Sequence, residues 1–204
     1  MKRIDDRTLL EKPARRAFMA VAGTTALSAA AIGLLGAAPT LAADAKAKAK
    51  AKPTAGATVQ SLNQALALEL ELVAAYQAFP GTGVLNKVAI RYAQAFLGHH
   101  QTHVERLSAA VKAMGGKPVA AKSKAAYAKS LNIAALKNAA DVMHLALRLE
   151  KGSADAYFSM IVGLGDPVLA QVIARLGADT AMHWGVIADA LGTPISQKAM
   201  SFGA

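Results

Sequence analysis

Helical periodicity is the feature of this sequence that most limits what the chain can fold into. From Ser61 onward the apolar residues recur every three or four positions in four stretches, and none of them alternates as a β-strand would. The stretches span residues 61–78, 84–114, 133–162 and 167–191, with glycine or proline between them. Because each stretch has one apolar face to bury, the sequence predicts an all-α fold of four helices.

The links between these stretches predict how the helices are connected. A short "FPGTG" joins the first two, and an equally short link containing Asp166 and Pro167 joins the last two. Short links place consecutive helices side by side and antiparallel, whereas the longer "KPVAAKSKAAYAKSLN" can cross from one end of a bundle to the other. We therefore expect a four-helix bundle made of two antiparallel hairpins joined by one crossover connection.

The two predicted hairpins share landmarks. The dipeptide Leu-Glu ends at Glu69 in the first helix and at Glu150 in the third, and a tyrosine follows each at the same spacing. His103 follows Glu69 at nearly the same interval as His183 follows Glu150. This agreement indicates a duplicated helix pair.

Several polar residues fall on the apolar faces when the helices are projected at 100° per residue. Five of them turn inward: Glu69, His100, His103, Glu150 and His183. Burying ionised carboxylates costs several kcal/mol unless they are paired or coordinated. Either a divalent cation or direct Glu–His hydrogen bonds would compensate, and the residues alone leave both open.

Three further predictions concern other residues on these faces. Tyr76 and Tyr157 are expected to be core aromatics whose hydroxyl groups meet the inward carboxylates. His144 is interpreted as a core histidine, and His99 lies at the rim of its apolar stripe. The chain has no cysteine, so any metal must be held by imidazole, carboxylate, hydroxyl or water.

The chain resembles the ferritin-like superfamily, in particular the exported bacterial ferritin-like domain proteins. The resemblance covers roughly residues 61–191 and rests on "LNQALALELELVAAY", the Gly-Gly-Lys-Pro-Val turn and "DTAMHWGVI". It implies a ferritin-like four-helix bundle with a di-iron-type site. Such a site takes one glutamate from each of two helices and a Glu-x-x-His pair from each of the other two.

Carried over position by position, the resemblance gives an incomplete ligand set. Glu69 and Glu150 match the single glutamates, and His103 and His183 match the histidines. His100 and Thr180 stand where the family pattern has glutamate. The expected metal ligands are therefore Glu69, His100, His103, Glu150 and His183, with Asp179 as a partial replacement for the second missing carboxylate.

This altered set predicts one divalent metal per chain, iron or a similar ion, rather than two. The fold alone does not carry oxidase chemistry with it. A metal-binding protein for metal handling or stress protection, a metal-dependent oxidase and a metal-free structural or stress-related bundle all stay open, and so does enzyme activity. No phosphate loop, nucleotide fingerprint or nucleophile triad is present in the sequence.

The first 43 residues resemble an export signal. A charged start leads to Arg15-Arg16, then to a mildly apolar run over residues 17–38, and small residues precede Asp44. The arginine pair is similar to the twin-arginine signal, so we expect an exported, periplasmic protein. An uncleaved membrane anchor is the alternative, because the run is roughly long enough to span a bilayer.

Residues 44–58 are rich in alanine and lysine and predict a solvated, disordered tether before a ferritin-like domain at residues 59–204. The formal net charge is +10. An exported protein meets little nucleic acid, so no nucleic-acid partner is expected. Membrane contact is expected only through the signal or the tether, and a homo-oligomer stays open.

Overall fold

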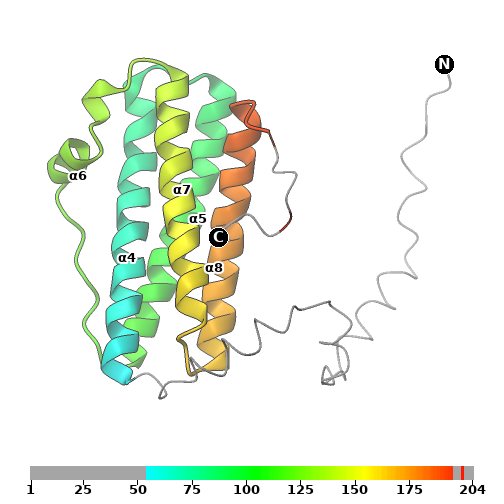
Figure 1. Ribbon diagram of the computed structural model, residues 1–204. Coiled ribbons are helices and arrows are strands. Elements are labelled where there is room, and N and C mark those ends of the chain that lie inside the picture. Colours follow the sequence, from blue (N-terminus) through cyan, green and yellow to red (C-terminus); the bar gives the residue numbers. More distant parts are fainter. Residues whose placement is uncertain (1–53, 195–198, 200–204) are drawn as a thin grey trace, which may run out of the picture. The chain divides into compact units, whose positions relative to one another are not determined.

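The computed structural model describes residues 54–194 and residue 199. Within these residues the chain forms five α-helices and no strand, which confirms the all-α prediction. The helices are α4 (Ala55–Ala78), α5 (Lys87–Ala113), α6 (Lys124–Ser130), α7 (Ala139–Ile161) and α8 (Pro167–Ala190) (Figure 1). The predicted signal and most of the predicted tether lie outside the described residues.

Four long helices lie side by side, and the short α6 lies outside them beside α4 (Figure 1). The 3-10 helix η1 (Phe79–Thr82) joins α4 to α5, and a short turn joins α7 to α8. Helix α4 also packs against α7, and α5 against α8, which closes the bundle. Two hairpins joined by a crossover are therefore present as predicted.

Helix α4 begins earlier than the sequence analysis predicted. The predicted helix started at Ser61, but α4 starts at Ala55, and the Thr54 side chain accepts a hydrogen bond from the Ala57 amide at 3.3 Å. Thr58 is buried on the same face as Leu62, so the apolar face extends one turn further back. Residues 55–58 thus belong to the helical domain rather than to the tether.

The crossover connection is fixed to α4 where it leaves α5. The Asn63 side chain donates to the carbonyl of Lys117 at 3.0 Å and accepts from the amide of Val119 at 2.8 Å. A Cβ on Gly116 would come within 2.5 Å of the Val59 side chain, so only glycine lets the chain pass this close to the helix.

The start of the third long helix also differs from the prediction. Residues 133–135 form a separate 3-10 helix, η2, and α7 starts only after Asn138. The Asn138 side chain and Asp141 form a reciprocal capping box, which ends the irregular segment and starts the helix. The apolar periodicity alone had predicted a helix that began at Ile133.

Two apolar clusters fill the bundle, one toward each end. One cluster includes Leu72, Phe79 and Val142, and the other includes Leu66, Leu107 and Ile173. Along every long helix, the inward polar residue falls between residues of the first cluster and residues of the second. The polar residues therefore form one layer across the middle of the core, here called the polar layer.

The prediction for His144 was wrong. Its side chain is exposed, because the buried face of α7 runs through Val142, Ala146 and Glu150. None of the described helices has the length and apolar character needed to cross a membrane.

Candidate metal centre

The polar layer brings together five side chains from the four long helices. Glu69 comes from α4, His100 and His103 from α5, Glu150 from α7 and His183 from α8. Each is at most 1% exposed, so the prediction that these five residues turn inward is confirmed. The fold thus places two carboxylates and three imidazoles out of contact with solvent.

His100 lies between the two carboxylates. Its Nδ1 is 2.8 Å from Oε2 of Glu69, and its Nε2 is 3.1 Å from Oε1 of Glu150. Burial alone would lower the pKa of His100, but these two carboxylates outweigh burial and raise its pKa to about 9. With both nitrogens protonated, His100 would form an ion pair with each glutamate.

The same contacts keep both carboxylates ionised. Burial acts to raise the pKa of Glu69, but the neighbouring imidazoles of His100 and His103 outweigh it and lower the pKa to about 2. The pKa of Glu150 is lowered likewise, with burial opposed by His100 and His183. Two negative charges therefore persist inside the core.

Two tyrosines orient the carboxylates, and each comes from the opposite hairpin. Tyr157 of α7 donates to Oε1 of Glu69 at 2.6 Å, and Tyr76 of α4 donates to Oε1 of Glu150 at 2.5 Å. Burial, followed by the neighbouring carboxylate, raises the pKa of each hydroxyl, so both stay protonated donors. The prediction that these hydroxyls meet the carboxylates is confirmed. Oε2 of Glu69 contacts His100, whereas Oε2 of Glu150 has no hydrogen-bond partner.

Three ligand-type atoms in the polar layer are buried without a hydrogen-bond partner. They are Nδ1 of His103, Nδ1 of His183 and Oε2 of Glu150. Nδ1 of His103 lies 3.4 Å from Oε2 of Glu69, and Nδ1 of His183 lies 3.4 Å from Oε2 of Glu150. Buried polar atoms rarely remain unpaired, so a cation bound between each terminal histidine and its glutamate would give these atoms a partner.

The donor atoms form two groups of three that share His100. The Glu69 group consists of Glu69, His100 and His103, and the Glu150 group consists of Glu150, His100 and His183. Within each group the ligand atoms lie within 4.8 Å of one another. Two imidazoles and one carboxylate form the donor set of mononuclear iron(II) sites, and zinc also accepts it.

The outer nitrogens of the two terminal histidines have different partners. Nε2 of His103 is 3.4 Å from Oδ2 of Asp179, and Nε2 of His183 is 2.8 Å from Nδ1 of His99. Burial, and then the charge of His183, lowers the pKa of His99, which favours a neutral His99 ring at this contact. These contacts hold Nδ1 of each terminal histidine toward its glutamate.

Asp179 was predicted as a ligand, but it joins neither group. Its carboxylate is half-exposed and contacts the nitrogen of His103 that faces away from Glu69. Helix geometry explains this, because Asp179 lies one residue before the inward Thr180. Thr180 itself donates to the carbonyl of Leu176 at 2.8 Å within its own helix, so α8 supplies only His183 to the centre.

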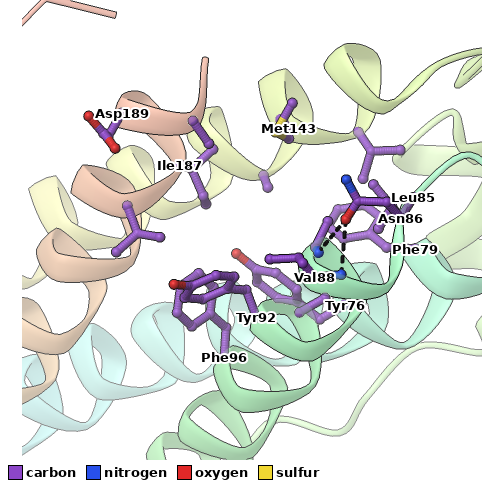
Figure 2. Close-up of a pocket in the computed structure, with 16 residues that line it drawn as sticks. Tyr76, Phe79, Leu85, Asn86, Val88, Tyr92, Phe96, Met143, Ile187 and Asp189 are labelled. Carbon is purple, nitrogen blue, oxygen red and sulfur yellow. Dashed lines mark hydrogen bonds between the residues drawn. The ribbon is translucent and has the colours of Figure 1, made fainter. Parts of the chain in front are cut away.

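A pocket of about 380 Å³ lies beside the Glu150 group. Figure 2 shows the rings of Tyr76, Tyr92 and Phe96 gathered in this pocket, with Ile187 also lining it. Phe96 stacks on His183 with ring centroids 4.0 Å apart. The lining is mostly apolar, and Tyr76 and Phe96 separate the pocket from the metal-type donors.

A second, polar pocket of about 320 Å³ lies beside the Glu69 group. Asp179, His99 and His103 line it together with Arg106 and Arg175. It therefore connects the half-exposed Asp179 with the buried His103.

Sequence reasoning missed two contributors to the centre. Ser153 donates to Oε1 of Glu69 at 3.3 Å, and it lies one turn after Glu150 on the same face of α7. His99 was placed at the rim of its helix and not connected to His183. The signal for Ser153 was its helical phase, whereas the contact of His99 depends on how closely α5 approaches α8.

Comparison with known proteins supports the architecture. Residues 57–193 match the family model of the ferritin-like domain, and the chain belongs to this family. Among solved structures, it is similar to a conserved hypothetical protein, rv2844, from Mycobacterium tuberculosis, with a TM-score of 0.59 and 19% sequence identity. That alignment covers 71% of this chain and 99% of the other, and it supports the fold. A comparison with curated proteins gives no significant match.

Proposed function

We propose that this protein is an exported ferritin-like bundle that binds one divalent metal ion, iron or a similar ion, in the polar layer. One observation carries the proposal: three buried atoms that could bind metal have no hydrogen-bond partner, and they belong to the two groups that contain the ionised carboxylates. The residues that would hold the ion are Glu69, His100, His103, Glu150 and His183. When bound, an ion with this donor set provides a Lewis acid with open coordination positions.

Charge balance supports one ion rather than two. A single divalent cation neutralises the carboxylates of Glu69 and Glu150, whereas a second would leave excess positive charge in a solvent-free layer. Uncompensated charge in a protein interior costs several kcal/mol even after relaxation. The family's two further carboxylates, which would balance a second ion, are replaced here by His100 and Thr180.

Metal handling or stress protection outside the cytoplasm is the role we propose for this site. The Arg15-Arg16 pair and the apolar run after it support export. We expect no nucleic-acid partner, and membrane contact only through the signal or the lysine-rich segment. A homo-oligomer stays open.

Elemental analysis of the protein purified from the periplasm without a histidine tag tests metal binding. We expect about one equivalent of a divalent transition metal per chain. His100→Ala should reduce this content to background, whereas replacement of the exposed His144 by alanine should leave it unchanged. A wild-type protein that stays metal-free after loading with iron, zinc and manganese would instead favour a metal-free structural bundle.

That metal-free alternative has its own support, because a protonated His100 pairs with both glutamates without any metal. The test above separates the two, since in a metal-free bundle His100→Ala would lower stability while wild-type metal content was already at background.

A metal-dependent oxidase is a second candidate, favoured by the apolar pocket beside Tyr76 and Phe96. A small apolar substrate would fit this volume. Oxygen and peroxide consumption by the iron-loaded protein tests it, with the His100→Ala protein as control. Turnover in the wild type alone would support the oxidase, and equal background rates would exclude it.

Export has a separate test. Changing Arg15 and Arg16 together to lysine should leave the precursor in the cytoplasm, because the twin-arginine signal depends on both guanidinium groups. Fractionation and immunoblotting measure the distribution. Undiminished periplasmic accumulation of the double variant would contradict the export proposal.

A further inference from the structure

We propose that the Glu69 group and the Glu150 group are two alternative positions for the same metal ion, and that His100 permits only one of them to be filled at a time. This inference rests on the proposed metal binding. It adds that the centre is a pair of mutually exclusive sites with a shared ligand, rather than one site that uses all five side chains together.

His100 lies between the two groups and belongs to both. Its two ring nitrogens face different carboxylates, with Nδ1 toward Glu69 and Nε2 toward Glu150. A neutral imidazole has one N–H group and one nitrogen with a free lone pair. It can therefore complete one group of three donors while its other nitrogen remains a hydrogen-bond donor.

The group left without metal keeps a hydrogen bond from His100. When the ion lies in the Glu69 group, the proton of His100 is on Nε2 and is donated to Oε1 of Glu150, at 3.1 Å. When the ion lies in the Glu150 group, the proton is on Nδ1 and is donated to Oε2 of Glu69, at 2.8 Å. In each arrangement the free carboxylate keeps a buried donor, so neither is left unpaired.

Each group is complete by itself. Each has its own glutamate and its own terminal histidine, and each terminal histidine has an outer partner that orients it, Asp179 for His103 and His99 for His183. Each glutamate is also held by a tyrosine of the opposite hairpin. Three protein ligands with an open position are sufficient for zinc or iron(II).

Titration of the purified full-length chain with Zn²⁺ against a chromophoric chelator tests the inference. The wild type should bind one zinc ion. His103→Gln and His183→Gln should each still bind one zinc ion, because the affinities of two alternative positions add and each variant keeps one of them. The less affected variant should lose no more than about twofold in apparent affinity, and the other more than that, up to about tenfold. The double variant should bind zinc more than about 100-fold more weakly than the wild type. Even residues that only hydrogen-bond to a ligand contribute about 10–100-fold to metal affinity, and the double variant loses two ligands.

Matched controls keep the outcome interpretable. His144→Gln changes an exposed histidine of α7 and should behave as wild type. Circular dichroism checks each fold, and Glu69→Gln and Glu150→Gln provide a second pair for the same comparison if a histidine variant unfolds.

Each outcome bears on a different claim. Single variants that lose as much affinity as the double variant would show one five-ligand site, which overturns this inference and leaves the proposed function standing. Two zinc ions in the wild type would overturn mutual exclusion. No binding by the wild type would overturn the proposed function itself and this inference with it.

Discussion

The Glu69 group and the Glu150 group have the same three kinds of donor, yet their surroundings differ. Behind His103 lies the half-exposed carboxylate of Asp179, in a polar pocket that also contains two arginines. Behind His183 lies the imidazole of His99. Phe96, which lines the apolar pocket, stacks on the ring of His183.

This difference shows that two hairpins with matching landmarks need not place their donors in equal surroundings. A carboxylate behind a ligating histidine raises its basicity more than a neutral imidazole does. The apolar pocket, in contrast, is where a small uncharged molecule could approach the centre. The two groups should therefore differ in affinity and in access, and the following experiments measure how far they differ.

Loss of His100, which belongs to both groups, should have the largest effect. His100→Ala leaves two buried carboxylates without their common partner, so the free energy of unfolding of the metal-free protein should fall by about 3–5 kcal/mol. Urea denaturation measures this change, with His144→Ala as the control. A change below about 1 kcal/mol would show that His100 does not hold the two groups together.

Raising the pH should have a smaller effect of the same kind. The pKa of His100 is about 9 in the fold, above its ordinary value of about 6.5. The ion pairs of His100 with the two glutamates therefore stabilise the fold fully below about pH 6.5, and this stabilisation is lost as the pH rises through about 9. The pKa of Glu69 is lowered in the fold from about 4.5 to about 2. The ionised Glu69 therefore stabilises the fold above about pH 4.5, and this stabilisation is lost as the pH falls through about 2.

Thermal melting of metal-free protein should therefore show its highest midpoint between about pH 4.5 and 6.5. The decline toward pH 9 should be weaker than the effect of His100→Ala, because a neutral His100 still donates to one carboxylate. His100→Ala itself should remove the decline. A melting temperature that rises from pH 6.5 to 9 in the wild type would contradict this assignment.

The two tyrosines offer a comparison between the groups. Tyr157→Phe and Tyr76→Phe each remove a hydrogen bond to a buried carboxylate, so each should lower the free energy of unfolding by about 1.5–3 kcal/mol. Ser153 also donates to Glu69 but not to Glu150, so Tyr157→Phe should cost less than Tyr76→Phe. Urea denaturation of both variants measures the order, and the reverse order would contradict this view of the carboxylate contacts.

The outer partners should have the smallest effects, visible only when one group is isolated. In the His183→Gln background, Asp179→Asn should weaken zinc binding about tenfold, the lower end of the range for groups behind a ligand. In the His103→Gln background the same change should have no effect, because the ion lies in the Glu150 group. If Asp179→Asn weakened zinc binding equally in both backgrounds, Asp179 would act through the overall charge of the protein and not through its contact with His103.

The helical phase was sufficient to predict the fold and most of the polar layer. Glu69, His100 and Glu150 each lie in the middle of an apolar face, so the burial of these residues follows from the spacing along single helices. The early start of α4 and the late start of α7 were missed because they depend on caps at Thr54 and Asn138.

Contacts between side chains of different helices could not be predicted from the sequence. The prediction that tyrosine hydroxyls meet carboxylates did not say that Tyr157 bonds Glu69 rather than Glu150, because the partner depends on how the two hairpins align. The place of Asp179 behind His103 depends likewise on the rotation of α8 against α5. Metal binding by these residues stays a prediction.

Anomalous diffraction from crystals of the zinc-loaded protein, recorded on both sides of the zinc absorption edge, tests the central claim most directly. We expect anomalous density in the polar layer on one or both sides of His100, with occupancies that add up to one ion per chain. Absence of density in this layer, with zinc bound only at the protein surface, would contradict the claim that the polar layer is a metal centre.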